Sequence, residues 1–159
     1  MITVDFVRKL FEYDAWANQQ ALASLSTVSE AEERPRKLFA HVIGAQHVWL
    51  ARFENPAPPS AQPWPVLSVS ECRACIDELH GQWMKLLSGL TPEKLADSLV
   101  YRNTKGDEYR TPIGDVLMHL VMHSAYHRGQ VAAAVRQAGG KPAATDYVVY
   151  VRKTGQMSS

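Results

Sequence analysis

Histidines at a four-residue spacing carry the strongest chemical signal in this sequence. His119, His123 and His127 follow one another within a largely apolar segment. Side chains four residues apart share one face of a helix, with Cβ atoms about 6 Å apart, so two successive imidazoles can bind one metal ion. The outer two would stand about 12 Å apart along the helix axis, so only one of the neighbouring pairs can belong to a mononuclear site. Neutral imidazole suits zinc, nickel, iron or copper better than magnesium or calcium.

A third ligand would have to come from another helix. His41 is a candidate, because it is in phase with the apolar positions of an earlier helical segment. His47 lies about 120° round that helix and is expected at the rim or on the surface. His80 is expected on a polar face, and His119 is either a neighbour of the site or a partner of a ligand. Without a third ligand, two histidines at this spacing are better explained by chance or by a hydrogen-bonded pair in the core.

Two polar residues, Asp14 and Asn18, interrupt the apolar stripe of the first helical segment. An unpaired buried polar group costs about 1–3 kcal/mol, so they either face a metal or substrate cavity or form hydrogen bonds at a helix crossing. The structural role is favoured for Asn18, and both roles stay open for Asp14. Tyr126 is equally consistent with substrate contact and with an interhelical hydrogen bond. Arg128 is expected to form a structural ion pair, with Asp146 as a candidate partner.

The remaining motifs exclude several common chemistries. Cys72 and Cys75 form a C-x-x-C, but both fall on the apolar stripe of a helical segment and no second C-x-x-C exists, so we predict small buried hydrophobes. The sequence has no glycine-rich phosphate loop, G-x-S-x-G or H-E-x-x-H motif. No residue stands out as a dedicated general base, which favours a mechanism based on a nucleophile held by the metal.

Four segments with helical periodicity must position these residues. They are residues 4–25, residues 35–53, residues 72–90 with Ser70 as the expected N-cap, and a segment from Thr111-Pro112 to Gly139-Gly140. Five prolines between Asn55 and Pro65 predict an extended crossover, residues 103–107 a hairpin turn, and residues 147–151 a second β-prone run. The prediction is one domain over residues 1–159: an all-α four-helix bundle with a long crossover linker and a small β-hairpin insertion. The sequence leaves the order of the helices open.

Composition narrows the class of protein. Of 159 residues, 46% are hydrophobic and 21% charged, which is typical of a globular chain and not of a disordered one. The net charge of +1 argues against nucleic acid or an anionic membrane as partner. Apolar runs such as residues 131–135 are far shorter than the roughly 20 residues of a membrane span. A charged N-terminal segment and two cysteines lead us to expect a cytoplasmic protein.

The sequence resembles the DinB/YfiT superfamily of metal-binding four-helix bundles over nearly its whole length. The resemblance is carried by four stretches: Tyr13-Asp-Ala-Trp16-Ala-Asn18, Leu38-Phe-Ala-His41 with Trp49-Leu50, His119 to Gln130, and Thr145-Asp146-Tyr147. The most specific part is the run H-x-x-x-H-R-G-Q, which begins at His123.

The resemblance implies a metal triad of His41, His123 and His127, with His47 outside it. It also implies zinc, nickel or iron as the ion, a small-molecule substrate and a homodimer. Relatives include thiol-dependent transferases, an isomerase and proteins described as metal-dependent hydrolases. Three neutral histidines leave a coordination position open, where an ion can hold a small thiol as thiolate or activate water. We rank a transferase that uses a low-molecular-weight thiol first, then a hydrolase, then a non-catalytic metal- or ligand-binding bundle.

Overall fold

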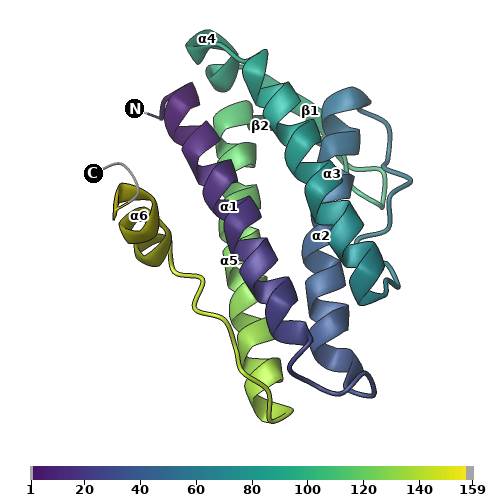
Figure 1. Ribbon diagram of the computed structural model, residues 1–159. Coiled ribbons are helices and arrows are strands. Elements are labelled where there is room, and N and C mark those ends of the chain that lie inside the picture. The colour runs from purple at the N-terminus through teal and green to yellow at the C-terminus, as the bar shows by residue number, and fades with distance from the viewer. Residues whose placement is uncertain (1, 157–159) are drawn as a thin grey trace.

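The computed structural model describes residues 2–156 and is built around four long helices (Figure 1). These are α1 (Val4–Leu25), α2 (Glu33–Glu54), α3 (Val69–Ser88) and α5 (Ile113–Gln137). The shorter elements are α4 (Pro92–Ala96), α6 (Tyr147–Gln156), and the strands β1 (Ser98–Arg102) and β2 (Glu108–Pro112), which pair as an antiparallel hairpin. The predicted four-helix bundle with a hairpin insertion is therefore confirmed.

The bundle has a crossover topology, in which consecutive helices are not all neighbours. α1 packs mainly on α3 and α5, and α2 mainly on α5 and α3, so α1 and α2 lie diagonally although they follow each other in the chain. The segment between α2 and α3 runs back along α2, so that α2 and α3 point in the same direction (Figure 1). The proline-rich crossover is thus a long strap on the side of α2.

α2 begins at Glu33, two residues before the predicted start, and two further helix starts differ from the sequence prediction. Ser68, and not Ser70, caps α3, because Ser68 and Glu71 form a reciprocal capping box. α5 begins at Ile113 and not at Thr111-Pro112, because Thr111 pairs with Leu99 in the hairpin. The backbone hydrogen-bonding groups of this segment are taken up by the sheet and are therefore not available to lengthen the helix.

The C-terminal run 147–151 is helical, so the prediction of a β-prone segment there was wrong. Tyr147 and Tyr150, three residues apart, both pack against Tyr13 of α1, with ring centroids 5.1 and 5.7 Å away. Residues three apart lie on one face of a helix, whereas in a strand they would point to opposite faces. Packing on α1 therefore decides the conformation against local β propensity.

The core lies between α1, α2, α3 and α5. Its largest fully buried apolar side chains include Trp83, Phe39 and Ile43. Cys72 is buried and Cys75 half-buried, both as free thiols, in agreement with a packing role. Burial raises the pKa of Cys72 to about 11. Within residues 2–156, no helix is long and apolar enough to cross a membrane.

Candidate metal centre

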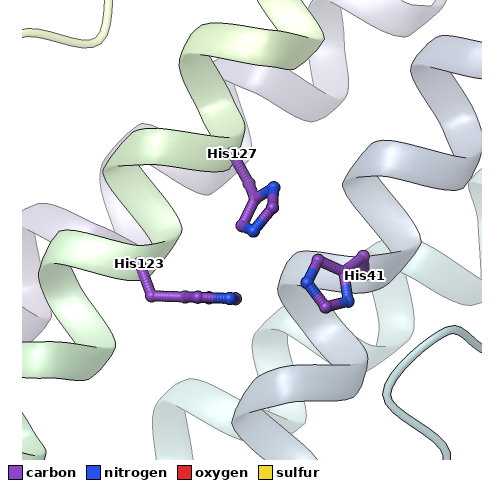
Figure 2. Close-up of side chains that lie close together, drawn as sticks. All are labelled: His41, His123 and His127. Carbon is purple, nitrogen blue, oxygen red and sulfur yellow. The ribbon is translucent and has the colours of Figure 1, made fainter.

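Three imidazoles meet between α2 and α5. His41 projects from α2 toward His123 and His127 on α5 (Figure 2). One nitrogen from each ring lies within 4.8 Å of the corresponding nitrogens of the other two. A zinc ion binds histidine nitrogens at about 2.0–2.1 Å, so one ion needs only small side-chain adjustments to reach all three. The structure thus brings together the three histidines that the resemblance had singled out.

Burial keeps two of these imidazoles neutral, so they can bind a cation without first giving up a proton. His41 is buried, and its pKa is lowered mainly by that burial, against the opposing effect of its hydrogen bond to Pro63. Burial and the neighbouring histidines lower the pKa of His123 to about 4. A neutral imidazole is the form that ligates metal ions. Both rings therefore present lone pairs at neutral pH.

Hydrogen bonds orient His41 and His127. Nδ1 of His41 lies 2.6 Å from the carbonyl oxygen of Pro63, and Nδ1 of His127 lies 2.7 Å from Oε1 of Gln130. Since these oxygens can only accept, each Nδ1 carries the proton and each Nε2 keeps its lone pair. Metal-ligating histidines are typically held in this way, through the ring nitrogen that does not bind the ion.

The crossover covers one side of the site. The indole of Trp64 stacks on His41, with ring centroids 3.7 Å apart and an angle of 7° between the planes, while 55% of Trp64 stays exposed. Gly44 allows this close approach: a Cβ there would lie 2.5 Å from Cδ of Pro65 and 2.6 Å from two backbone carbonyl oxygens of the crossover. Sequence reasoning missed the roles of Pro63, Trp64 and Gly44. The available signal was a glycine inside a predicted helix followed by a proline-rich segment.

The family model of the DinB family matches residues 1–157. The chain belongs to the DinB family. Protein DinB of Bacillus subtilis (strain 168) is 28% identical over 171 aligned residues, covering 94% of this chain and 96% of the relative. The uncharacterized protein YrdA of the same organism is 27% identical, covering 86% of this chain and 84% of the relative.

Solved structures share the fold of this DinB-family chain. YfiT from Bacillus subtilis, described as a probable metal-dependent hydrolase with an unusual four-helix bundle topology, aligns with a TM-score of 0.65 at 16% identity, covering 87% of this chain and 91% of YfiT. A DinB-like protein from Bacillus cereus ATCC 10987 aligns with a TM-score of 0.68 at 17% identity, covering 89% of this chain and 97% of that one.

Asp14 and Asn18 belong to a buried polar network in this DinB-family bundle. Nη1 of Arg128 donates to Oδ1 of Asp14 at 2.5 Å and to Oδ1 of Asn18 at 2.8 Å, and Nδ2 of Asn18 donates to Asp14 at 3.1 Å. The ion-pair partner of Arg128 is therefore Asp14, and the prediction of Asp146 was wrong. Gln46 of α2 donates to Asp14 at 2.8 Å and accepts from Nε1 of Trp83 at 3.1 Å. The network joins all four long helices.

This network bears directly on the candidate ligands. Arg128 follows His127 in the chain and is only 2% exposed. Its ion pair with Asp14 holds α5 against α1 directly beside the residue that carries the His127 side chain. Asp14 and Asn18 therefore have a packing role next to the cluster, since the hydrogen bonds that they form within residues 2–156 all lie within the network.

The other predicted residues lie around the cluster or away from it. Tyr126 is 67% exposed, packs edge-on against His127 with centroids 5.1 Å apart, and forms no hydrogen bond to another helix within residues 2–156. His119 is exposed, with its ring centroid 5.5 Å from that of His123, and stands outside the cluster. His47 is half-buried and lines a cavity of about 400 Å³ beneath the crossover. His80, also half-buried, is not part of the cluster.

Proposed function

We propose that this DinB-family protein binds one divalent metal ion at His41, His123 and His127 and transfers a low-molecular-weight thiol to an electrophilic small molecule. The observation that carries the proposal is the convergence of three imidazole nitrogens within 4.8 Å, with two rings oriented by hydrogen bonds at Nδ1. Zinc or nickel suits this ligand set best, and iron is the next choice. Three protein ligands leave room for a reactant beside the ion.

A bound divalent ion supplies the positive charge that keeps a thiol ionised near neutral pH. The surrounding residues hold the ligands in place and shield them: Pro63 and Gln130 orient two rings, and Trp64 covers the face of His41. Asp14, the buried carboxylate among the described residues, is occupied by Arg128. No buried acid in that part of the chain is left to act as a general base, which favours a thiol that loses its proton on binding.

A hydrolase is the second candidate. The supporting observation is the shared fold with YfiT, which is described as a probable metal-dependent hydrolase. The same three histidines would serve this chemistry, with water in place of the thiol. The exposed side chain of Tyr126, whose ring packs against His127, is available to contact substrate in either reaction.

Metal analysis of purified variants tests the site. We expect the wild-type protein to hold one equivalent of zinc or nickel, and His123→Ala to lose it while its circular dichroism spectrum stays helical. His119→Ala is the matched control, because His119 lies on the same helix and beside His123 but outside the cluster. Unchanged metal content in His123→Ala would refute the proposed site.

Turnover assays of the metal-loaded protein separate the functions. Product that forms only when a thiol and an electrophile are both present supports the transferase. Cleavage of esters or amides without a thiol supports the hydrolase instead. Stoichiometric metal with no turnover of either substrate panel favours a non-catalytic binding role.

A further inference from the structure

Arg52 is a partly buried cation without an acidic partner. Its Cζ lies 4.3 Å from the ring centroid of Trp49 and 4.9 Å from that of Tyr101. Its Nε is buried and has no hydrogen-bond partner, and no carboxylate within residues 2–156 forms an ion pair with it. Burial lowers the pKa of Arg52. A buried N–H that has lost solvent without gaining an acceptor is not explained by packing alone.

The aromatic corner around Arg52 is well defined. Trp49 on α2 and Tyr101 on β1 meet edge to face, with centroids 4.9 Å apart. The hydroxyl of Tyr101 lies 3.3 Å from that of Thr111 on β2, which ties this ring to the hairpin. Contacts with the two rings hold the guanidinium through cation–π attraction and use none of its N–H donors. The two Nη groups, which form no hydrogen bond within residues 2–156, remain available to a ligand.

Arg52 also lies in one row with the candidate metal centre. It is about three turns beyond His41 on α2, hence on the same face and roughly 16 Å away along the helix axis. The ring of His119 fills the interval, with its centroid 5.7 Å from that of Trp49 and 5.5 Å from that of His123. A chain of ring contacts therefore leads from the three histidines to the guanidinium.

We propose that Arg52 binds an oxyanion, a carboxylate or phosphate group, belonging to the molecule whose reactive end lies at the three histidines. A planar guanidinium matches either group with two parallel hydrogen bonds, which an ammonium cannot provide. The identity of the reactive end rests on the proposed function, whereas the oxyanion site does not. The inference restricts the substrate or its thiol partner to elongated acids that extend past His119 and Trp49.

The oxyanion site is tested first without any metal. The Nε–Hε NMR signal of Arg52 is followed in the full-length protein during titration with inorganic phosphate and, in a separate titration, with propionate. We expect a saturable shift at Arg52 and none at Arg110, which lies beside Glu108 on β2, in the hairpin that also carries Tyr101. The stronger of the two titrations identifies the group that is bound. A shift that does not saturate, or that is equal at Arg110, would overturn the inference.

The link to the metal centre is tested with zinc-loaded protein and a series of mercapto-carboxylic acids of increasing chain length. Mercapto-alcohols of the same lengths serve as uncharged controls. At the length that reaches Arg52, we expect the acid to bind about tenfold more tightly than the alcohol or better, because a charge-assisted hydrogen bond contributes that much. Equal affinity of acids and alcohols at every length would refute the role of Arg52 and leave the proposed function standing.

Substitutions of Arg52 distinguish paired hydrogen bonds to an oxyanion from mere stacking on the two rings. Arg52→Lys keeps the positive charge beside the rings but loses the two-donor geometry, so we expect it to lose most of the acid preference while unfolding at a temperature close to wild type. Arg52→Gln should lose all of the preference, and Arg110→Gln none. If no thiol binds to the zinc-loaded protein, the proposed function fails, and the metal-free titrations still decide the oxyanion site. Full acid preference in Arg52→Gln would contradict the inference.

Discussion

Substitution of Gly44 by alanine should weaken metal binding although Gly44 is not one of the three candidate ligands. The added Cβ would lie 2.5 Å from Cδ of Pro65 and 2.6 Å from the carbonyl oxygens of Gln62 and Pro63. Two of these neighbours are backbone atoms, which cannot rotate away. Since ordinary contact begins near 3.4 Å, the crossover must retreat from α2 by close to 1 Å.

That displacement has a calculable cost at the metal centre. The 2.6 Å hydrogen bond between Pro63 and Nδ1 of His41 would lengthen beyond the normal range, and Trp64 would move off the imidazole. Loss of such an outer hydrogen bond typically lowers metal affinity about 10–100-fold. The free energy of unfolding of the metal-free protein should change by a similar or smaller amount. Overpacking costs about 1–3 kcal/mol, and the higher helix propensity of alanine returns up to about 1 kcal/mol.

The measurement is competition for zinc between the protein and a chromophoric chelator, with tryptophan fluorescence as a second readout of Trp64. Gly81→Ala is the matched control. Gly81 lies inside α3, where a Cβ would meet nothing within 4 Å. We expect it to leave zinc affinity unchanged and to raise the free energy of unfolding by up to about 1 kcal/mol. Wild-type zinc affinity and an unchanged fluorescence spectrum in Gly44→Ala would refute the reasoning.

Three further predictions concern the buried charges, the histidines and the thiols. Asp14→Asn should lower the free energy of unfolding, measured in urea, by about 3–5 kcal/mol, because it leaves the buried guanidinium of Arg128 uncompensated; a loss below about 1 kcal/mol, the range of exposed ion pairs, would contradict this. The pKa of His123, about 4 in the folded metal-free protein against an ordinary 6.5, means that the unfolded chain binds more protons between these values. The free energy of unfolding should therefore fall as the pH drops from 6.5 toward 4, by well under about 3 kcal/mol because the ring is half-exposed. His123→Gln should flatten this pH dependence in denaturation curves recorded across that range. An unchanged slope in the variant would count against the assignment of the effect to His123. Cys72, with its pKa raised to about 11, should resist iodoacetamide in the native protein and react on unfolding, as read by peptide mass spectrometry; rapid native labelling would show that the thiol is accessible.

Helical periodicity was enough to predict the bundle, because each long helix has to bury an apolar stripe. It placed the first helix at residues 4–25, where the structure has α1. The errors arose in short segments whose local sequence is compatible with two conformations or two capping residues. The run 147–151 is rich in β-branched residues, but without a strand partner it packs its two tyrosines on α1 as a helix. Ser68 could have been found as the cap of α3 from the S-x-x-E spacing to Glu71.

The candidate site was partly accessible from the sequence. Helical spacing showed that His123 could share an ion with either His119 or His127. The choice of His127, like the specific choice of His41, came only through the family resemblance. The pairing of Asp14 with Arg128 spans 114 residues, and no local pattern encodes such a contact. The available signal was an acid, Asp14, and a base, Arg128, at buried positions of two different helices. The sequence analysis instead named Asp146, which is closer to Arg128 along the chain. The support given by Pro63 depends on how the crossover lies in space, which its prolines do not determine.

The strap formed by the crossover makes the metal centre dependent on a surface segment. The carbonyl oxygen that orients His41 belongs to Pro63, which lies outside any helix or strand. This oxygen keeps its position only while the strap packs against Gly44. Escape of an ion and detachment of the strap should then be one event with one rate. A protease cut between α2 and the strap's contact with Gly44 would accelerate release of the ion without unfolding the helices.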